Sequence, residues 1–223
     1  MNYATMFSGT ESPISEGGAW TNLSSNRTLV NTASGLAFGT QIGGGFDDSY
    51  ARLTQIWTPD VEIITTIFKG TTSGIQEVEH LHRLSDGGAD PSKVFAYEIN
   101  IARDGQYCDF VKWLGGTNNP GDFDYLVPTL TYSVPGGVNN GDRIKTTMVG
   151  NAINAYIDHG SGWVLINTGG PVVDTGTVYV TGRPAIGFFK TAGSGANNQF
   201  GWNDFQARTL GDPAPLAFGF WTT

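Results

Sequence analysis

The stretch VFAYEINIARDGQYCDFVKWL (residues 94–114) alternates apolar and polar side chains on both sides of one short turn. A period of two residues predicts half-buried β-strands over 94–103 and 106–114. Arg103-Asp104-Gly105 lies at their junction, and Gly supplies the positive φ of a tight turn at low cost. The stretch therefore predicts an antiparallel hairpin with one face toward a core.

The same pattern continues outward in both directions along the chain. Short alternating runs are separated by turn clusters rich in Gly, Asn, Asp and Pro, such as Asn139-Asn140-Gly141-Asp142. The other predicted strands cover residues 50–57, 61–69, 75–84, 126–133, 143–149, 152–158, 162–167, 185–190 and 198–208. No window of eleven or more residues has a clean 3.6-residue period, so we expect little or no helix.

Composition agrees with an all-β chain that has a core. The 223 residues include 32 Gly and 10 Pro, and 13 Phe, 8 Tyr and 6 Trp supply apolar volume, which excludes disorder. We predict a single domain over residues 1–223, an all-β, two-sheet antiparallel jelly-roll sandwich, with an up-and-down barrel as second choice. Residues 1–45 are expected to supply an edge strand around Ala19–Leu23 plus loops.

Charge and cysteine content narrow the classes of partner. The net charge of −8 opposes contact with phosphates, so we expect no nucleic-acid partner. No apolar run approaches the roughly 20 residues that span a bilayer, and we expect no membrane insertion. Cys108 is the single cysteine, which excludes an intrachain disulfide. The first residues lack the features of a signal peptide, so localisation stays open between extracellular after removal of a leader, and phage, virion or cytoplasmic.

Several stretches in a fixed order carry a resemblance to a known family. Gln76-Glu77-Val78-Glu79 leads to Arg83, and is followed by 97–100, 109–113, 140–144, 149–160, 182–188 and 201–205. Between about residues 45 and 208 these motifs resemble concanavalin A-like, laminin-G-like jelly-roll domains. The resemblance implies the jelly-roll fold, which hosts lectins, glycan-binding modules, glucanases, polysaccharide lyases, and adhesive or virion domains. The fold does not choose among them.

Glu77 and Glu79 are the first catalytic candidates. Two residues apart on a strand, they share one face with Cα atoms roughly 6.5 to 7 Å apart. This spacing suits the carboxyl pair of a retaining glycosidase. The pair resembles part of the Glu-x-Asp-x-Glu signature of laminarinases and lichenases, but position 81 is Leu, so the third carboxylate is missing. The alternative interpretation is two exposed carboxylates on a sheet face.

His82 is the third catalytic candidate. Alginate-type lyases of this fold use a His with a Tyr, an Arg and a Gln, and residues of those kinds occur here without the local motifs of that family. The alternative is a hydrogen-bonded core or surface histidine. The candidate substrate-binding residues are Trp113, Tyr97, Arg83, Lys112 and Asn118. They combine rings on which sugar C–H faces stack with polar groups that bind hydroxyls.

Calcium is the one candidate cofactor, in a structural role. Asp204 lies in the closing strand where glucanases of this fold use an Asp to hold the ion, and Asp47 precedes an earlier strand. The alternative is that Asp204 accepts hydrogen bonds from strand amides.

The leading hypothesis is a glycan-binding or adhesive module that recognises a polysaccharide by ring stacking and loop hydrogen bonds. The alternative is a polysaccharide-cleaving enzyme, either a glycoside hydrolase through Glu77 and Glu79 or a lyase through His82 and a Tyr. The third is a virion or surface-assembly protein, in which the apolar segment 215–221 contributes to a homo-oligomer.

Overall fold

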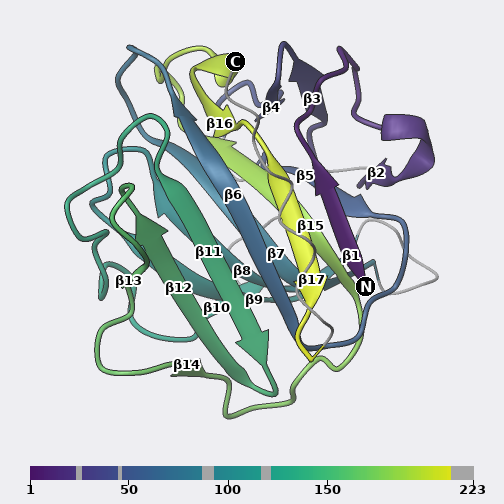
Figure 1. The fold of residues 1–223 in the computed structure, drawn as a ribbon, viewed down its shortest axis with the longest axis vertical. Coiled ribbons are helices and arrows are strands. Elements are labelled where there is room, and N and C mark those ends of the chain that lie inside the picture. Colours follow the sequence, from purple (N-terminus) through teal and green to yellow (C-terminus); the bar gives the residue numbers. More distant parts are fainter. Residues whose placement is uncertain (24–26, 45–46, 87–92, 117–121, 212–223) are drawn as a thin grey trace.

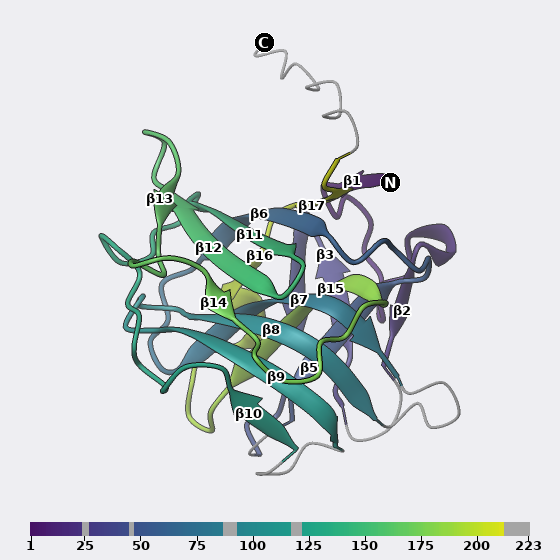
Figure 2. The ribbon, with the colours of Figure 1, turned by 90° about the horizontal axis from the view of Figure 1, so that it is seen from below.

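Two antiparallel β-sheets face each other across a hydrophobic core (Figure 1). The computed structural model describes residues 1–23, 27–44, 47–86, 93–116 and 122–211. Figure 2 shows the two layers, with β6, β11 and β12 in one and β7, β8 and β9 in the other. The arrangement is the predicted jelly-roll sandwich, and the only helical elements of the described residues are two 3₁₀ turns, η1 (Glu16–Gly18) and η2 (Asn197–Gln199).

One sheet has seven strands, with β7 at its centre. In spatial order these are β10 (Phe123–Tyr125), β9 (Cys108–Gly116), β8 (Val94–Ala102), β7 (Gln76–Ser85), β15 (Arg183–Lys190), β5 (Ser49–Leu53) and β2 (Trp20–Asn22). The predicted hairpin therefore forms β8 and β9, and the strand expected around Ala19–Leu23 is the edge strand β2.

The opposite sheet has ten strands. Its main path is β13 (Val164–Leu165), β12 (Ala152–Asp158), β11 (Arg143–Val149), β6 (Val61–Lys69), β16 (Phe200–Trp202), β4 (Leu36–Gly39) and β3 (Val30–Ala33). Beside this path, β17 (Phe205–Thr209) pairs with β6 and with β1 (Asn2–Thr5), and β14 (Val172–Val173) pairs with β12. Residues 1–45 thus contain β1, β3 and β4, which were not predicted because four-residue strands are too short to show alternation.

The core lies between the sheets because each strand turns alternate side chains inward. Val78, Ile99 and Phe110 come from the seven-stranded sheet, and Ile63 and Trp202 from the ten-stranded sheet. A smaller cluster covers part of the outer face of the seven-stranded sheet and includes Leu81, Val111 and Trp113 with Tyr50. Both faces of β7 are therefore buried over most of its length.

The strand predicted over 126–133 does not form. Pro128 lacks the N–H of a ladder residue, and the Asp109 carboxylate accepts hydrogen bonds from Thr129 Oγ1 at 2.6 Å and Leu130 N at 2.8 Å. These contacts stabilise a loop, and the short strand β10 precedes it.

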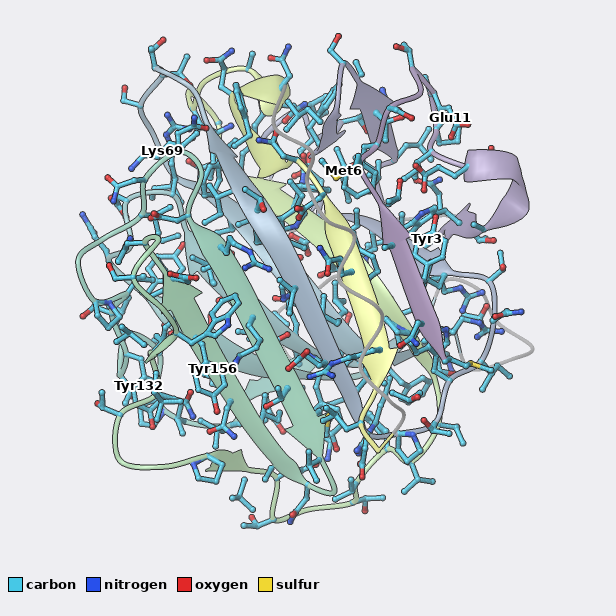
Figure 3. All side chains as sticks on the ribbon, in the orientation of Figure 1. Tyr3, Met6, Glu11, Lys69, Tyr132 and Tyr156 are labelled. Atoms are coloured by element: carbon cyan, nitrogen blue, oxygen red, sulfur yellow. The ribbon has the colours of Figure 1, made fainter. Side chains whose placement is uncertain are left out.

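On the outer face of the ten-stranded sheet, Tyr156 projects toward the viewer in Figure 3. Lys145 Nζ lies 4.3 Å from the centroid of its ring and 4.6 Å from that of Trp163, and the Arg143 guanidinium lies 5.1 Å from Trp163. The faces of both rings are therefore already in contact with basic side chains of the same protein. No helix of the described residues is long and apolar enough to cross a membrane.

Candidate functional site

A pocket of about 260 Å³ opens on the outer face of the seven-stranded sheet. Five carboxyl groups line it, with Asn100 and several aromatic rings. They belong to Asp48, Glu77, Glu79, Glu98 and Asp109. The strand register explains their proximity, because Glu79 lies opposite Asn100, which lies opposite Asp109 on the next strand. Three central strands, β7, β8 and β9, therefore contribute to one site.

Glu98 is held by three donors. Its Oε2 accepts hydrogen bonds from Tyr50 OH at 2.8 Å and Trp113 Nε1 at 2.7 Å, and its Oε1 accepts one from Asn100 Nδ2 at 3.3 Å. Burial raises the pKa of Glu98, although these hydrogen bonds oppose the shift. Asn100 is fixed in turn, because its Oδ1 accepts the Asp109 N–H at 3.1 Å. This part of the pocket is organised before any ligand binds.

Glu77 and Glu79 lie beside this network on β7. Burial raises the pKa of Glu77 to about 8, and Tyr107 OH donates a hydrogen bond to its Oε1. Burial, together with the charges of Glu98 and Asp48, raises the pKa of Glu79 well above its ordinary value. Burial therefore favours the protonated form of both side chains.

Among the five carboxyl groups of the pocket, that of Glu79 has a buried oxygen without a hydrogen-bond partner in the described part of the chain. It is 1% exposed, and its Oε2 has no hydrogen-bond partner among the described residues. The space for it exists because β15 carries Gly187 at the paired position, where a Cβ would lie 2.1 Å from this oxygen and 2.7 Å from Tyr50 Cδ1. Within the described residues, this oxygen is therefore buried without a hydrogen-bond partner.

Aromatic rings form one side of the pocket. Trp113 packs against Phe123 with ring centroids 5.0 Å apart, and Phe123 packs against Tyr125 at 5.6 Å. Arg27 lies over the Trp113 ring at 4.9 Å and over Tyr50 at 5.5 Å. Trp113 is only 3% exposed, whereas Tyr125, which also lines the pocket, is 46% exposed.

The structure brings together three of the predicted site residues and separates others from them. Glu77, Glu79 and Trp113 line the pocket. His82 and Tyr97 occupy positions of the opposite parity and point between the sheets, where both are fully buried. A lyase centre that combines His82 with Tyr97 in this pocket is therefore incompatible with the fold.

Lys112 and Arg83 are also buried, and their charged groups contact other parts of the protein. Lys112 Nζ contacts Asp174 Oδ2 at 2.7 Å and donates to Thr177 O at 2.6 Å. Arg83 donates to the carbonyl oxygens of Pro59, Tyr179 and Gly150, at 2.9, 2.6 and 2.7 Å. Both cations link β-strands to loops, so we do not retain them as glycan ligands. Asn118 lies outside the described residues.

The two aspartates proposed for calcium lie on different sheets. Asp204, between β16 and β17, accepts hydrogen bonds from Thr66 N at 2.6 Å and Thr66 Oγ1 at 2.9 Å. Asp47 precedes β5 and accepts one from Ile42 N at 3.0 Å. Across the described ranges, no three His, Cys, Asp or Glu side chains are placed to hold a metal ion together. A structural calcium ion at Asp204 and Asp47 therefore stays a prediction.

Most of the residues that line the pocket are not among the site residues predicted from the sequence. Glu98 and Asn100 lie two residues apart in one alternating run, so the sequence predicts that they share a face of that strand. Asp109 belongs to the next alternating run. Alternation does not show that β8 pairs with β7 and β9 with β8. This pairing brings Glu98, Asn100 and Asp109 beside Glu79. Asp48 and Arg27 precede strands and had no periodic signal.

His80 and His82 form a buried network with two threonines of the ten-stranded sheet. Thr146 Oγ1 lies 3.0 Å from His80 Nδ1 and 2.8 Å from His82 Nε2, and Thr65 Oγ1 lies 2.9 Å from His80 Nε2. Burial lowers the pKa of His82 to about 3 and that of His80 well below its usual range. Both rings are therefore neutral in the folded protein at moderately acidic pH.

We expect His82 to destabilise the fold progressively as the pH falls from about 6.5 toward 3. In this window the unfolded chain binds a proton that the folded protein does not, which costs up to about 1.4 kcal/mol per pH unit. The free energy of unfolding of the wild type and of His82→Asn should be compared by denaturant titration at pH 7, 5.5 and 4. The variant should gain stability relative to the wild type on acidification, whereas a constant difference contradicts a buried neutral His82.

The sheet order, the sandwich and the pocket on the central strands together define a concanavalin A-like jelly roll. No family model matches the chain, and no curated protein matches it in sequence. Solved structures do match the fold. The carbohydrate binding module CBM66 from Bacillus subtilis is 16% identical with a TM-score of 0.53, over 84% of this chain and 90% of the module.

Two further structures show how widely this fold is used. The exoplasmic/lumenal domain of VIP36, in a form bound to Ca²⁺ and Man3GlcNAc, is 9% identical with a TM-score of 0.56, over 96% of this chain and 92% of its own. The Bacillus licheniformis beta-glucanase is 13% identical with a TM-score of 0.51, over 92% and 97%. The fold neighbours thus include a carbohydrate binding module, a legume lectin-like domain from Entamoeba histolytica and a beta-glucanase.

Proposed function

We propose that this protein binds a glycan in the pocket on the outer face of the seven-stranded sheet. The observation that carries the proposal is the combination, in one pocket, of the exposed Tyr125 ring with the fixed polar groups of Glu98 and Asn100. A sugar ring offers C–H faces to an aromatic ring and hydroxyls to carboxyl and amide groups. The carbohydrate-binding proteins among the fold neighbours support this choice.

Cleavage of the bound glycan is the second candidate. A retaining hydrolase needs one protonated and one ionised carboxyl group about 5 Å apart. With its pKa raised to about 8, Glu77 holds the proton of a general acid at neutral pH, and Glu79 lies two residues along the same strand face. Glu79 has a raised pKa as well, so it must lose a proton before it can attack. This cost ranks cleavage below binding.

The assembly hypothesis rests on residues 215–221, which lie outside the described residues. A homo-oligomer formed through this segment stays a prediction.

One experiment separates binding from cleavage. The wild type is incubated with soluble and insoluble polysaccharides, including glucans, mannans, fructans, chitin, chitosan and uronans, while retention and new reducing ends are both measured. We expect retention, with Tyr125→Ala weakening the affinity about tenfold, or ~1.4 kcal/mol. Tyr156→Ala is the matched control, because that tyrosine lies on the outer face of the other sheet (Figure 3).

Each outcome decides between the candidates. Retention without product supports a binding module, and product that disappears in Glu77→Gln makes the protein a hydrolase. Equal losses in Tyr125→Ala and Tyr156→Ala contradict the assignment of the pocket. If no polysaccharide is retained or cleaved, the proposed function is wrong.

A further inference from the structure

Acidic side chains outnumber basic ones in and around the pocket. Its five carboxyl groups come from β7, β8, β9 and the segment before β5. Arg27 is a cation that interacts with several of them, and burial with the Glu98 charge still raises the pKa of Asp48 to about 7 against the opposing effect of Arg27. A ligand that brings positive charge would stabilise the ionised forms of these carboxyl groups, which burial and mutual repulsion disfavour.

The carboxyl groups differ in what they lack. The Glu98 oxygens accept hydrogen bonds from Tyr50, Trp113 and Asn100. Glu77 accepts one from the Tyr107 hydroxyl. Asp109 accepts from Thr129 and from a backbone N–H. Glu79 Oε2, by contrast, is buried without a hydrogen-bond partner among the described residues. The ionised form of Glu79 thus lacks a donor at this atom, and a ligand in the pocket that Glu79 lines would supply one.

The geometry favours an ammonium group over a metal ion as that donor. Among the residues that the structure describes, no three carboxylates or imidazoles converge closely enough to form a metal site. An ammonium group needs only separate acceptors at about 2.7 to 3.2 Å and donates up to three hydrogen bonds. The cavity of about 260 Å³ is smaller than the pockets of roughly 300 to 1,000 Å³ that hold drug-sized ligands, which fits one sugar ring.

We propose that the pocket selects glycans whose sugar ring carries a protonated amino group, as in a deacetylated amino sugar, with the ammonium donating to Glu79. This inference rests on the proposed glycan binding and specifies its ligand. Acetylation of the amine removes its charge and adds bulk, so the N-acetylated sugar loses the contact. A sugar with a hydroxyl at the same position keeps the shape but not the charge.

The proposal has a proton balance that can be measured. The groups that face Glu79 are Glu98, Asp48 and Glu77, with Arg27 and the Tyr50 hydroxyl. Without a ligand, burial and these carboxyl groups raise the pKa of Glu79 and so favour its protonated form. An ammonium ion favours the ionised form, so its binding displaces a proton from the pocket to the solvent.

The test uses three oligosaccharides of equal length and β-1,4 linkage that differ only at the second carbon of each ring. These are the glucosamine, N-acetylglucosamine and glucose oligomers, titrated calorimetrically into the full chain at pH 5.5, where the amines already carry their proton. We expect the glucosamine oligomer to bind at least tenfold more tightly than the other two. Titration in buffers of different ionisation enthalpy should show proton release for this oligomer alone.

Two isosteric variants locate the preference. Glu79→Gln should reduce the preference for the glucosamine oligomer at least fivefold and remove the proton release. Asp104→Asn, a carboxyl-to-amide change at an exposed position of the turn between β8 and β9, should leave both unchanged. Thermal unfolding of each variant establishes that it is folded before its affinity is interpreted. If Glu79→Gln does not fold, the comparison of the three ligands on the wild type still decides.

The outcomes distinguish this inference from the function on which it rests. Equal or tighter binding of a neutral oligomer overturns the preference for an amine and leaves glycan binding intact. The preference is also overturned if the glucosamine oligomer does not bind while another polysaccharide does. Failure of every glycan to bind overturns the proposed function itself.

Discussion

Replacement of Gly182 by Ala should destabilise the protein by about 3 kcal/mol or more. Gly182 has a φ of +148°, and a Cβ built on it would lie 2.2 Å from the carbonyl carbon and oxygen of Arg83. These are backbone atoms at the irregular end of β7, where Arg83 itself has a φ of +55°. They cannot rotate away as a side chain would. The Gly182 carbonyl also accepts the Trp57 N–H at 2.9 Å, so a shift breaks a further contact.

The matched control is Gly162→Ala. Gly162 also has a positive φ, +109°, but nothing lies within 4 Å of the position of its Cβ. Its replacement should cost only the backbone strain, roughly 1 to 2 kcal/mol. Free energies of unfolding from denaturant titration give both values. Equal costs for the two variants would mean that the close approach to Arg83 is relieved at little expense.

Lys112→Met should cost about 3 to 5 kcal/mol, because it leaves the buried Asp174 carboxylate without its cation. Lys112 and Asp174 have side chains 9% and 5% exposed, and Lys112 also lies over the rings of Tyr97 and Tyr179. The ion pair joins β9 to the segment that follows β14. The loss should therefore appear as lower global stability and not only as a local rearrangement.

A second substitution tests the cause. Asp174→Asn combined with Lys112→Met removes the buried charge while keeping an acceptor for Tyr97 OH, so the double variant should recover part of the loss. Lys145→Met, which removes a half-buried cation over Tyr156, should cost less than about 1 kcal/mol. If Lys145→Met costs as much as Lys112→Met, burial of the ion pair is not the reason.

The strand pattern was predictable because alternation is a local property. Residues 94–103 and 106–114 form β8 and β9 nearly as the spacing indicates, and the Gly-rich turns end the strands where φ becomes positive. The prediction of a strand over 126–133 was wrong because the alternation in that segment gives no sign of its contacts with β9. There, the Asp109 carboxylate accepts hydrogen bonds from Thr129 and Leu130 and so stabilises a loop. Glu77 and Glu79 share a face for the same local reason that makes them visible in the sequence.

The class of fold, the common face of Glu77 and Glu79, and the turns can all be predicted from the sequence, because each depends on neighbours along the chain. Which face of each strand meets the other sheet depends instead on how the two sheets pack. On β7 both faces are buried and both carry polar residues, so alternation alone cannot say that His82 points inward while Glu79 points into the pocket. The gathering of Glu98 and Asp109 beside Glu79 likewise depends on strand register, which is set by contacts between residues distant in sequence.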